Sequence, residues 1–126
     1  MEVTETDRTV VQRVYEAMQA GPSGENLMLD LFTPDGVLVE PFSGQPRTHT
    51  GQDEIRQCYR AMMDMPRPPD FTLTVDRIWM KGDNVVADWT CSSQMMPAPL
   101  KGRDDFTIRD GRIERLEISL VGGMPQ

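Results

Sequence analysis

The second half of the chain, from Phe71 onward, alternates apolar and polar residues between short turn sequences. Asp110-Gly111 is a two-residue hairpin signal, because the favoured turn needs positive φ at positions that Asp and Gly tolerate. A turn centred on Gly82-Asp83 precedes it in the same half of the chain. Four strands are therefore predicted, in two hairpins, over residues 71–80, 85–95, 100–109 and 112–121.

The first half of the chain has helical spacing instead. Apolar residues on one face of Asp7–Ala20 predict a helix that Gly21-Pro22 ends. Helices kept apart from a mostly antiparallel sheet define the α+β class, and the length suits one domain over residues 1–126. The other predicted elements are a short apolar helix at 24–32, a turn at 34–36, a strand at 37–42 and a helix that Thr50 begins, with Asp53 as its capping-box residue.

The last predicted strand changes its apolar face partway along. Ile113 is at an odd position, whereas Leu116, Ile118 and Leu120 are at even positions. Such a phase change indicates a β-bulge near Glu114–Arg115, and bulges bend sheets. A bent sheet with helices on its concave side encloses a cavity. The ten methionines suit either such an adaptable pocket or ordinary core filling.

Charge and composition argue against several partners. The net charge is −7 and no run of Lys or Arg makes a basic stripe, so neither nucleic acid nor an anionic membrane surface is expected to bind. No apolar run reaches the roughly 18 residues of a membrane helix, and the acidic N-terminus is unlike a signal peptide, so a cytoplasmic protein is expected. Cys58 and Cys91 have no CxxC spacing and the chain has one His, so two free thiols and no metal site or cofactor are expected.

Glu40 is the candidate that most needs a reason, because it lies in an apolar strand before Pro41. It shares strand parity with Leu38 and Phe42. If these face the core, the carboxylate faces it too, and burial would raise its pKa toward that of a general base. If Val37 and Val39 face the core instead, Glu40 faces water; parity alone leaves both readings open.

Asp104 is the second candidate carboxylate. It shares parity with Phe106 and Ile108, so it is the inward member of the Asp104-Asp105 pair. A buried carboxylic acid that stays neutral can donate a hydrogen bond to a developing oxyanion. The alternative is a structural Asp paired with Arg103, Lys101 or a backbone amide.

Four further side chains have a structural and a functional interpretation. Tyr15 and Tyr59 lie near the apolar faces of two helices, where a phenol either packs or reaches a cavity. Trp89 suits packing or ligand stacking. His49 is expected in a loop before a helix, either exposed or at the mouth of a pocket.

The chain resembles the SnoaL-like or NTF2-like superfamily, in particular its ketosteroid-isomerase-like branch. The resemblance implies a curved antiparallel sheet wrapped around three helices, a conical pocket, a small hydrophobic molecule as ligand and a homodimer through the outer face of the sheet. It rests on four stretches: T-V-V-Q-R-V-Y-E-A-M-Q-A-G, V-E-P-F-S-G-Q-P at Val39–Pro46, H-T-G-Q-D-E-I-R-Q-C-Y-R and G-R-D-D-F-T-I-R-D-G-R-I.

The resemblance also assigns site residues. The family's base precedes a Pro at the end of the first strand, which is Glu40 here, and its neutral oxyanion-binding Asp matches Asp104. Its supporting Tyr matches Tyr59. The family's oxyanion tyrosine aligns with Val14, whereas Tyr15 lies about 100° around the helix. That departure, and a Glu in place of an Asp base, argue against steroid isomerisation itself.

Two classes of function follow. The first is a cofactor-free enzyme that uses Glu40 to move a proton on a hydrophobic carbonyl or enol, with Asp104 and Tyr15 or Tyr59 on the oxygen, as an isomerase, cyclase or dehydratase. The second is a non-catalytic protein that binds a small hydrophobic ligand, or a dimeric accessory protein. The side chains expected to line the pocket are Tyr15, Leu38, Phe42, Tyr59, Trp89, Phe106, Leu116, Ile118 and Leu120, with His49 at its mouth.

Overall fold

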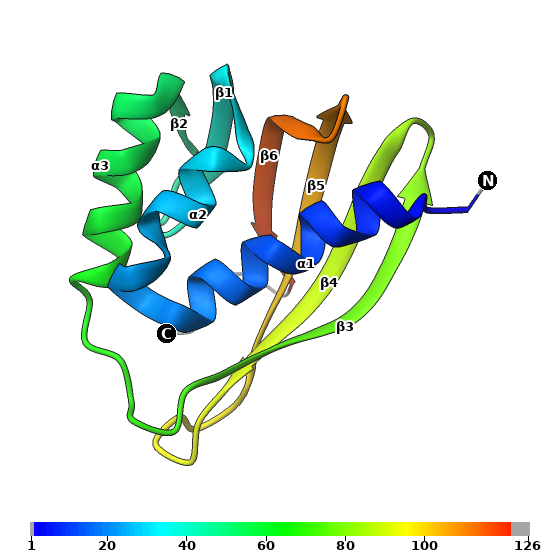
Figure 1. Ribbon diagram of the computed structural model, residues 1–126. Helices are drawn as coiled ribbons and strands as arrows, with labels where there is room; N and C mark the ends of the chain where they lie inside the picture. The colour runs from blue at the N-terminus through cyan, green and yellow to red at the C-terminus, as the bar shows by residue number, and fades with distance from the viewer. Residues whose placement is uncertain (1, 122–126) are drawn as a thin grey trace.

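The computed structural model describes residues 2–121, so both ends of the predicted 1–126 domain, residue 1 and residues 122–126, lie outside the described residues. The helices lie in the first half of the chain and the strands β3 to β6 in the second half, as the sequence predicts (Figure 1). The elements are α1 (Glu5–Ala20), η1 (Gly21–Gly24), α2 (Glu25–Asp30), β1 (Phe32–Glu40), β2 (Arg47–Thr50), α3 (Gly51–Met63), β3 (Thr72–Lys81), β4 (Asn84–Ser92), β5 (Leu100–Arg109) and β6 (Arg112–Leu120).

The strands form one six-stranded sheet in the order β2-β1-β6-β5-β4-β3. Each neighbouring pair is antiparallel except β1 and β6, which run parallel. The sheet curves, and α1 and α2 lie across its concave side while α3 packs beside β1 and β2 (Figure 1). The predicted α+β class with a curved, mostly antiparallel sheet is confirmed.

The bulge predicted in the last strand is present. Thr107 on β5 pairs with Arg115, and the next residue, Ile108, pairs with Ile113, which leaves Glu114 as the extra residue. Because of this insertion, Ile113 and Leu116 both turn into the core, with exposures of 0% and 2%. The predicted hairpin turn before β6 is also confirmed, since Asp110 and Gly111 have φ of 52° and 77°.

The region between α2 and α3 differs from the prediction. The predicted turn at 34–36 lies inside β1, which starts at Phe32 and has an irregular register against β6 between Phe32 and Val37. The expected loop around His49 contains the short strand β2, in which His49 pairs with Leu38. Strand β2 has only four residues, and its partially exposed, polar sequence gives no alternation from which it can be recognised.

Local sequence sets the ends of the two long helices. The Thr4 side chain accepts a hydrogen bond from the Asp7 amide at the start of α1, and Gly21, with φ of 74°, ends it. At the start of α3, Glu54 rather than Asp53 accepts a bond from the Thr50 amide, at 3.0 Å. None of the helices in residues 2–121 is long and apolar enough to span a membrane.

Candidate functional site

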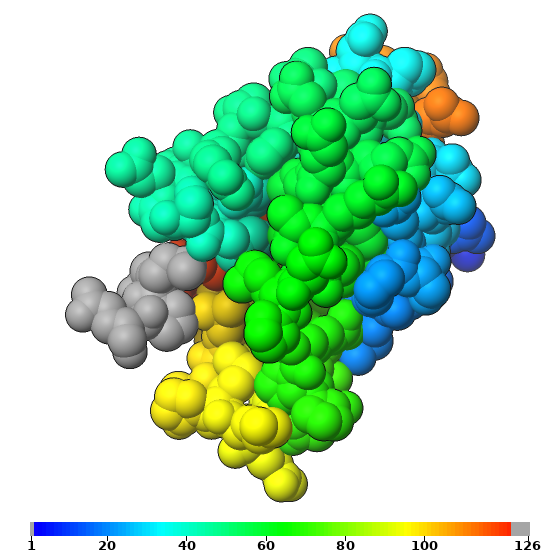
Figure 2. All heavy atoms as spheres, turned by 90° about the vertical axis from the view of Figure 1, so that its left-hand side faces the viewer, coloured from blue at the N-terminus to red at the C-terminus, as the bar shows by residue number. Residues whose placement is uncertain are grey.

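An apolar cavity of about 430 Å³ lies between the concave side of the sheet, α1, α3 and the segment that follows α3. That segment meets the β4–β5 connection on one face of the molecule, where Asp70 accepts hydrogen bonds from Ser93 Oγ and the Gln94 amide (Figure 2). The volume is within the range of small-molecule sites. The lining residues are Val14, Tyr15, Met18, Met28, Leu38, Phe42, Ile55, Tyr59, Met62, Met63, Met65, Pro66, Arg67, Pro68, Phe71, Leu73, Trp89, Cys91, Met96, Leu100, Asp104, Leu116 and Ile118.

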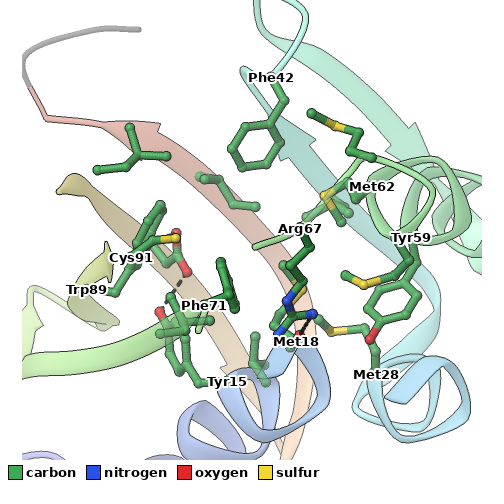
Figure 3. Close-up of a pocket in the computed structure, with 18 of the residues that line it drawn as sticks. Tyr15, Met18, Met28, Phe42, Tyr59, Met62, Arg67, Phe71, Trp89 and Cys91 are labelled. Atoms are coloured by element: carbon green, nitrogen blue, oxygen red, sulfur yellow. Dashed lines mark hydrogen bonds between the residues drawn. The ribbon is translucent and has the colours of Figure 1, made fainter. Parts of the chain in front are cut away.

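Asp104 is the carboxylate that reaches this cavity, and it is only 4% exposed. The Tyr15 hydroxyl donates to its Oδ2 at 2.6 Å, and the indole Nε1 of Trp89 donates to its Oδ1 at 2.9 Å (Figure 3). Burial raises the pKa of Asp104 to about 7, although the two hydrogen bonds act to lower it. This group therefore exists in both protonation states near neutral pH.

The sheet register positions the indole over the carboxylate. Trp89 on β4 pairs with Gly102 on β5, two residues before Asp104. A Cβ at Gly102 would overlap the Trp89 ring, so the ring lies directly over the glycine backbone. Glycine at this position is what lets the indole lie flat on the sheet and point Nε1 at Asp104.

The phenol comes from α1. Tyr15 and its neighbour Val14 are both buried and both line the cavity, because the helix lies across the concave sheet and presents a broad face to it. The sequence argument left open whether Tyr15 turns into the pocket. The structure places it there, with its hydroxyl on Asp104 and with its own pKa raised well above the ordinary value by burial and by the nearby carboxylate.

The protonation state of Asp104 sets the direction of its hydrogen bond with Tyr15, whereas Trp89 donates in both states. An indole N–H only donates, whereas a phenol can donate or accept. When Asp104 is ionised, Tyr15 and Trp89 both donate to it. When Asp104 is protonated on Oδ2, it can donate to the Tyr15 oxygen, and the Tyr15 hydroxyl is then free to donate to a ligand.

Glu40 lies in a different cluster. Its side chain is 1% exposed and lies outside the set of lining residues. Its Oε1 accepts from the Phe42 amide at 2.9 Å, and its Oε2 accepts from Arg47 Nε at 3.1 Å and contacts His49 Nε2 at 2.8 Å. Parity left open whether Glu40 faces an apolar cavity or water; it is buried, but against Arg47 and His49 rather than in the cavity wall.

The pKa of Glu40 moves in the direction opposite to the sequence-based argument. Burial alone would raise it, but the hydrogen bonds from His49 and Phe42 and the charge of Arg47 outweigh burial and lower it. A carboxylate with a lowered pKa is a weak base, and Glu40 is not among the residues that line the cavity. The buried charge is better explained by the ion pair at the end of β1 than by proton transfer.

The same cluster contains a set of metal-ligand atoms. One donor atom from each of Glu40, His49 and Cys58 lies within 4.8 Å of the other two. The sequence argument counted only His and Cys residues as ligands and therefore did not consider a set that includes a carboxylate. Arg47 contacts the same Glu40 oxygen. The Arg47 guanidinium at that oxygen opposes a metal ion, and burial with the Glu40 charge raises the pKa of the Cys58 thiol to about 11. The residues therefore fit a closed ion pair better than a metal site.

Most of the other expected pocket residues reach the cavity. Leu38, Phe42, Tyr59, Trp89, Leu116 and Ile118 line it, and Phe106, Leu120 and His49 do not. Phe106 is buried in the core instead, and Leu120 packs at its edge. The Tyr59 hydroxyl lies 2.8 and 2.7 Å from the carbonyl oxygens of Ala17 and Gly21, so it holds α3 against the end of α1.

Sequence reasoning missed one charged lining residue, Arg67, and the methionines that line the cavity. Arg67 lies between Pro66 and Pro68 in a segment that has no periodic pattern. Six lining residues are methionines, among them Met18, Met28 and Met62 (Figure 3). The high methionine content was the only signal for them, and it suited core filling equally well.

Solved structures of very different sequence have the same fold. One is a candidate ketosteroid isomerase from Kribbella flavida DSM 17836, with 16% identity, a TM-score of 0.71, and coverage of 98% of this chain and 83% of that one. Another is a candidate SnoaL-like polyketide cyclase from Jannaschia sp. CCS1, with 14% identity, a TM-score of 0.72, and coverage of 95% and 90%. A third is an NTF2-like protein of unknown function from Mesorhizobium loti, with 16% identity, a TM-score of 0.71, and coverage of 94% and 93%.

The sequence itself gives the family. Comparison with curated proteins finds no match. The family model described as the SnoaL-like domain matches residues 11–116, which span α1 to β6 and include Tyr15, Trp89 and Asp104. The chain belongs to the SnoaL-like domain family.

Proposed function

We propose that this protein is a cofactor-free enzyme that moves a proton on a hydrophobic carbonyl or enol substrate, in an isomerase, cyclase or dehydratase reaction, with Asp104 as the group that takes and returns the proton. The observation that carries the proposal is a single carboxylate with a pKa of about 7 in the wall of an apolar cavity. A general base works best when its pKa is near the working pH. This assignment gives Asp104 the role that the sequence suggested for Glu40.

The geometry supports a coupled role for Tyr15. Ionised Asp104 takes a proton from a carbon next to the substrate carbonyl; the C–H electron pair moves toward the oxygen and forms an enolate. Protonated Asp104 then donates to the Tyr15 oxygen, which frees the Tyr15 hydroxyl to donate to the enolate oxygen. Asp104 then returns its proton to another atom of the substrate. The reaction involves no net transfer of protons or electrons and therefore needs no cofactor.

The cavity wall supports a hydrophobic substrate. Apart from Asp104, Arg67 and the polar atoms of Tyr15, Tyr59 and Trp89, the lining side chains are apolar. Such a wall excludes water and strengthens electrostatic interactions inside it. The ketosteroid isomerase and polyketide cyclase descriptions of similar structures concern reactions on carbonyl compounds, and they agree with this substrate class.

The test compares the two buried carboxylates without a known product. Hydrophobic cyclic ketones are incubated with the protein in D₂O, and exchange of the α-hydrogens is followed by NMR. Asp104→Asn should lower the exchange rate about 10²–10⁴-fold, the usual contribution of a proton-transfer group. Glu40→Gln is the matched control and should retain exchange within about tenfold of the wild type.

The reverse result would make Glu40 the base and would overturn the assignment. If no ketone exchanges but several bind, the second candidate applies: a protein that holds a small hydrophobic ligand without chemistry. The observation that favours this candidate is that Asp104 already accepts from two donors and is satisfied without a ligand. In both cases the homodimer through the outer face of the sheet remains part of the proposal, and sedimentation or gel filtration tests it.

A further inference from the structure

Arg67 places a positive charge in the apolar wall of the cavity, and neither catalysis by Asp104 nor packing requires a charge there. Within residues 2–121, Arg56 is the other half-buried arginine and pairs with Glu25 at 2.5 Å, whereas Arg67 has no carboxylate within 4 Å. The remaining arginines without such a partner in this part of the chain have exposed side chains: Arg8, Arg13, Arg77 and Arg112. A half-buried guanidinium in an apolar wall without a counter-charge is expensive unless something else offsets it.

The contacts of Arg67 offset only part of this cost. Its two terminal nitrogens donate to the carbonyl oxygens of Met18 and Gln19, at 3.0 and 2.7 Å, at the end of α1. A helix end has a partial negative charge of about half a unit, so this cap neutralises the guanidinium incompletely. A guanidinium has five N–H donors, and these contacts use two of them. The Phe71 ring lies 3.9 Å from the guanidinium carbon and holds it from one side.

The charge of Arg67 acts inside the cavity. Burial raises the pKa of Tyr59 and of Cys91, and the Arg67 charge opposes burial at both. These two side chains come from α3 and β4 and line different walls. Figure 3 shows the Arg67 side chain between the Tyr59–Met62 side and the Trp89–Cys91 side of the pocket. The Arg67 side chain therefore lines the space that a ligand would occupy, with its terminal nitrogens beside that space at the end of α1.

The backbone holds Arg67 in this position. Pro66 and Pro68 flank it, so its segment is stiff: proline restricts its own φ and disfavours helical geometry in the residue before it. Further along, Asp70 anchors the segment to the β4–β5 connection through Ser93 and Gln94. A charge that is held in advance of binding loses little entropy when a ligand arrives.

We propose that the ligand is an amphipathic organic anion: an apolar body with one carboxylate or similar oxyanion, which binds Arg67 while the apolar body extends toward Asp104. This deepens the proposed function and rests on it for the reaction, but not for binding. A planar guanidinium suits an oxyanion with two acceptors. The protein as a whole has a charge of −7, so an affinity for anions has to come from a local cation such as this one.

A pair of fluorescent probes with the same ring system tests the proposal. 1-Anilinonaphthalene-8-sulfonate has a sulfonate, and N-phenyl-1-naphthylamine is its neutral counterpart. The wild-type protein should bind the anionic probe at least tenfold more tightly than the neutral one. Arg67→Met, which keeps the length and apolar stem of the side chain, should remove that preference by weakening the anionic probe at least tenfold and the neutral probe less than twofold.

The control for net charge is Arg8→Met, which makes the same change of charge at an exposed position of α1 and should leave the preference unchanged. A second comparison measures how well decanoate, a carboxylate, and decanol, its neutral counterpart, displace the neutral probe. Because it uses the wild-type protein, it does not depend on the folding of any variant. Equal affinity for the charged and neutral members of each pair, or a preference that survives Arg67→Met, would overturn the proposal. Because these experiments measure binding, anion preference can be found even if Asp104→Asn leaves hydrogen exchange unchanged. Equally, hydrogen exchange can depend on Asp104 when no anion preference is found.

Discussion

The Tyr15 hydroxyl donates a 2.6 Å hydrogen bond to Asp104 across 89 residues of sequence, and it joins the first helix to the fifth strand inside the cavity. A bond of this kind stabilises the ionised carboxylate, and so does the second one, from Trp89. Burial therefore raises the pKa of Asp104, and the hydrogen bonds from Tyr15 and Trp89 lower it. The contribution of each donor can be measured by removing it.

Removing either donor should raise the pKa of Asp104 further above 7. In Tyr15→Phe or Trp89→Phe the carboxylate loses a hydrogen bond that favours its charged form, while burial still disfavours that form. Carboxyl ¹³C NMR titration measures the change. Tyr59→Phe is the control, because that hydroxyl contacts only backbone carbonyls, and it should leave the Asp104 titration where it is. A lower pKa in either test variant would show that these bonds do not act as described.

Asp104 should make the protein less stable as the pH rises. Folding raises its pKa from 3.8 to about 7, so the folded state binds the proton more tightly than the unfolded state. Its contribution to the free energy of unfolding is complete below about pH 4 and is lost as the pH rises to about 7, by about 1.4 kcal/mol per pH unit. Urea denaturation at pH 5 and pH 8 measures this difference.

Asp104→Asn supplies the comparison for that measurement. Its amide cannot ionise, and it can accept from Trp89 while donating to the Tyr15 oxygen, as the neutral acid does. The variant should therefore lose the extra destabilisation between pH 5 and pH 8 and be more stable than the wild type at pH 8. An unchanged pH dependence would mean that Asp104 titrates normally.

Glu40→Gln should destabilise the fold by about 1–3 kcal/mol at pH 7, because a buried charged acceptor with several hydrogen bonds becomes neutral. The pKa of Glu40 is lowered in the folded state, so its stabilisation is present above the unfolded pKa and is lost as the pH falls through the folded one. The difference between variant and wild type should accordingly shrink in acid. Thermal and urea unfolding at pH 7 and pH 3.5 measure it.

Arg47→Gln is the companion variant for that experiment. The Arg47 side chain is 56% exposed, so the loss of its half of the ion pair should cost at most about 1 kcal/mol. A larger loss from Arg47→Gln than from Glu40→Gln would contradict the view that the buried carboxylate, and its bonds to His49 and Phe42, stabilise the end of β1.

Gly102→Ala should displace the Trp89 ring and remove its bond to Asp104. The added Cβ would overlap the indole, and overpacking of this kind typically costs about 1–3 kcal/mol. The near-ultraviolet circular dichroism of Trp89 and the unfolding free energy both report the change. Trp89→Leu relieves the overlap, so the double variant should lose less stability than the sum of the single ones. If the stability losses of the two single variants add exactly in the double variant, the Trp89 ring does not contact Gly102.

The sequence was enough to predict the elements in which one signal dominates. The odd and even positions of Ile113 and Leu116 predict a bulge between them, and that bulge is present at Glu114. Asp110-Gly111 likewise allows little except the tight turn that it makes. Strand β2 escaped prediction because its four polar residues show no alternation, and the start of β1 because it pairs with the distant strand β6.

The candidate site divides in the same way. Parity identified Asp104 as inward-facing, because its neighbours Phe106 and Ile108 are strongly apolar. The direction of the pKa shift at Glu40 depends on Arg47 and His49, whose approach follows from the unpredicted strand β2. Arg67 lies between two prolines, and only the three-dimensional arrangement shows that its side chain lines the cavity.

The position of β6 between β1 and β5 has a consequence for the order of synthesis. Until β6 leaves the ribosome, the ribbon of β1 and β2 shares no sheet hydrogen bonds with the meander of β3, β4 and β5 within the described residues. The nascent chain therefore exposes the future cavity wall as two separate apolar surfaces. Parallel pairing of β1 with β6 joins residues about 80 positions apart, and such distant contacts form slowly. A chain arrested before Arg112 should consequently be a better client of chaperones than one that includes β6, in which the two parts of the sheet can pair.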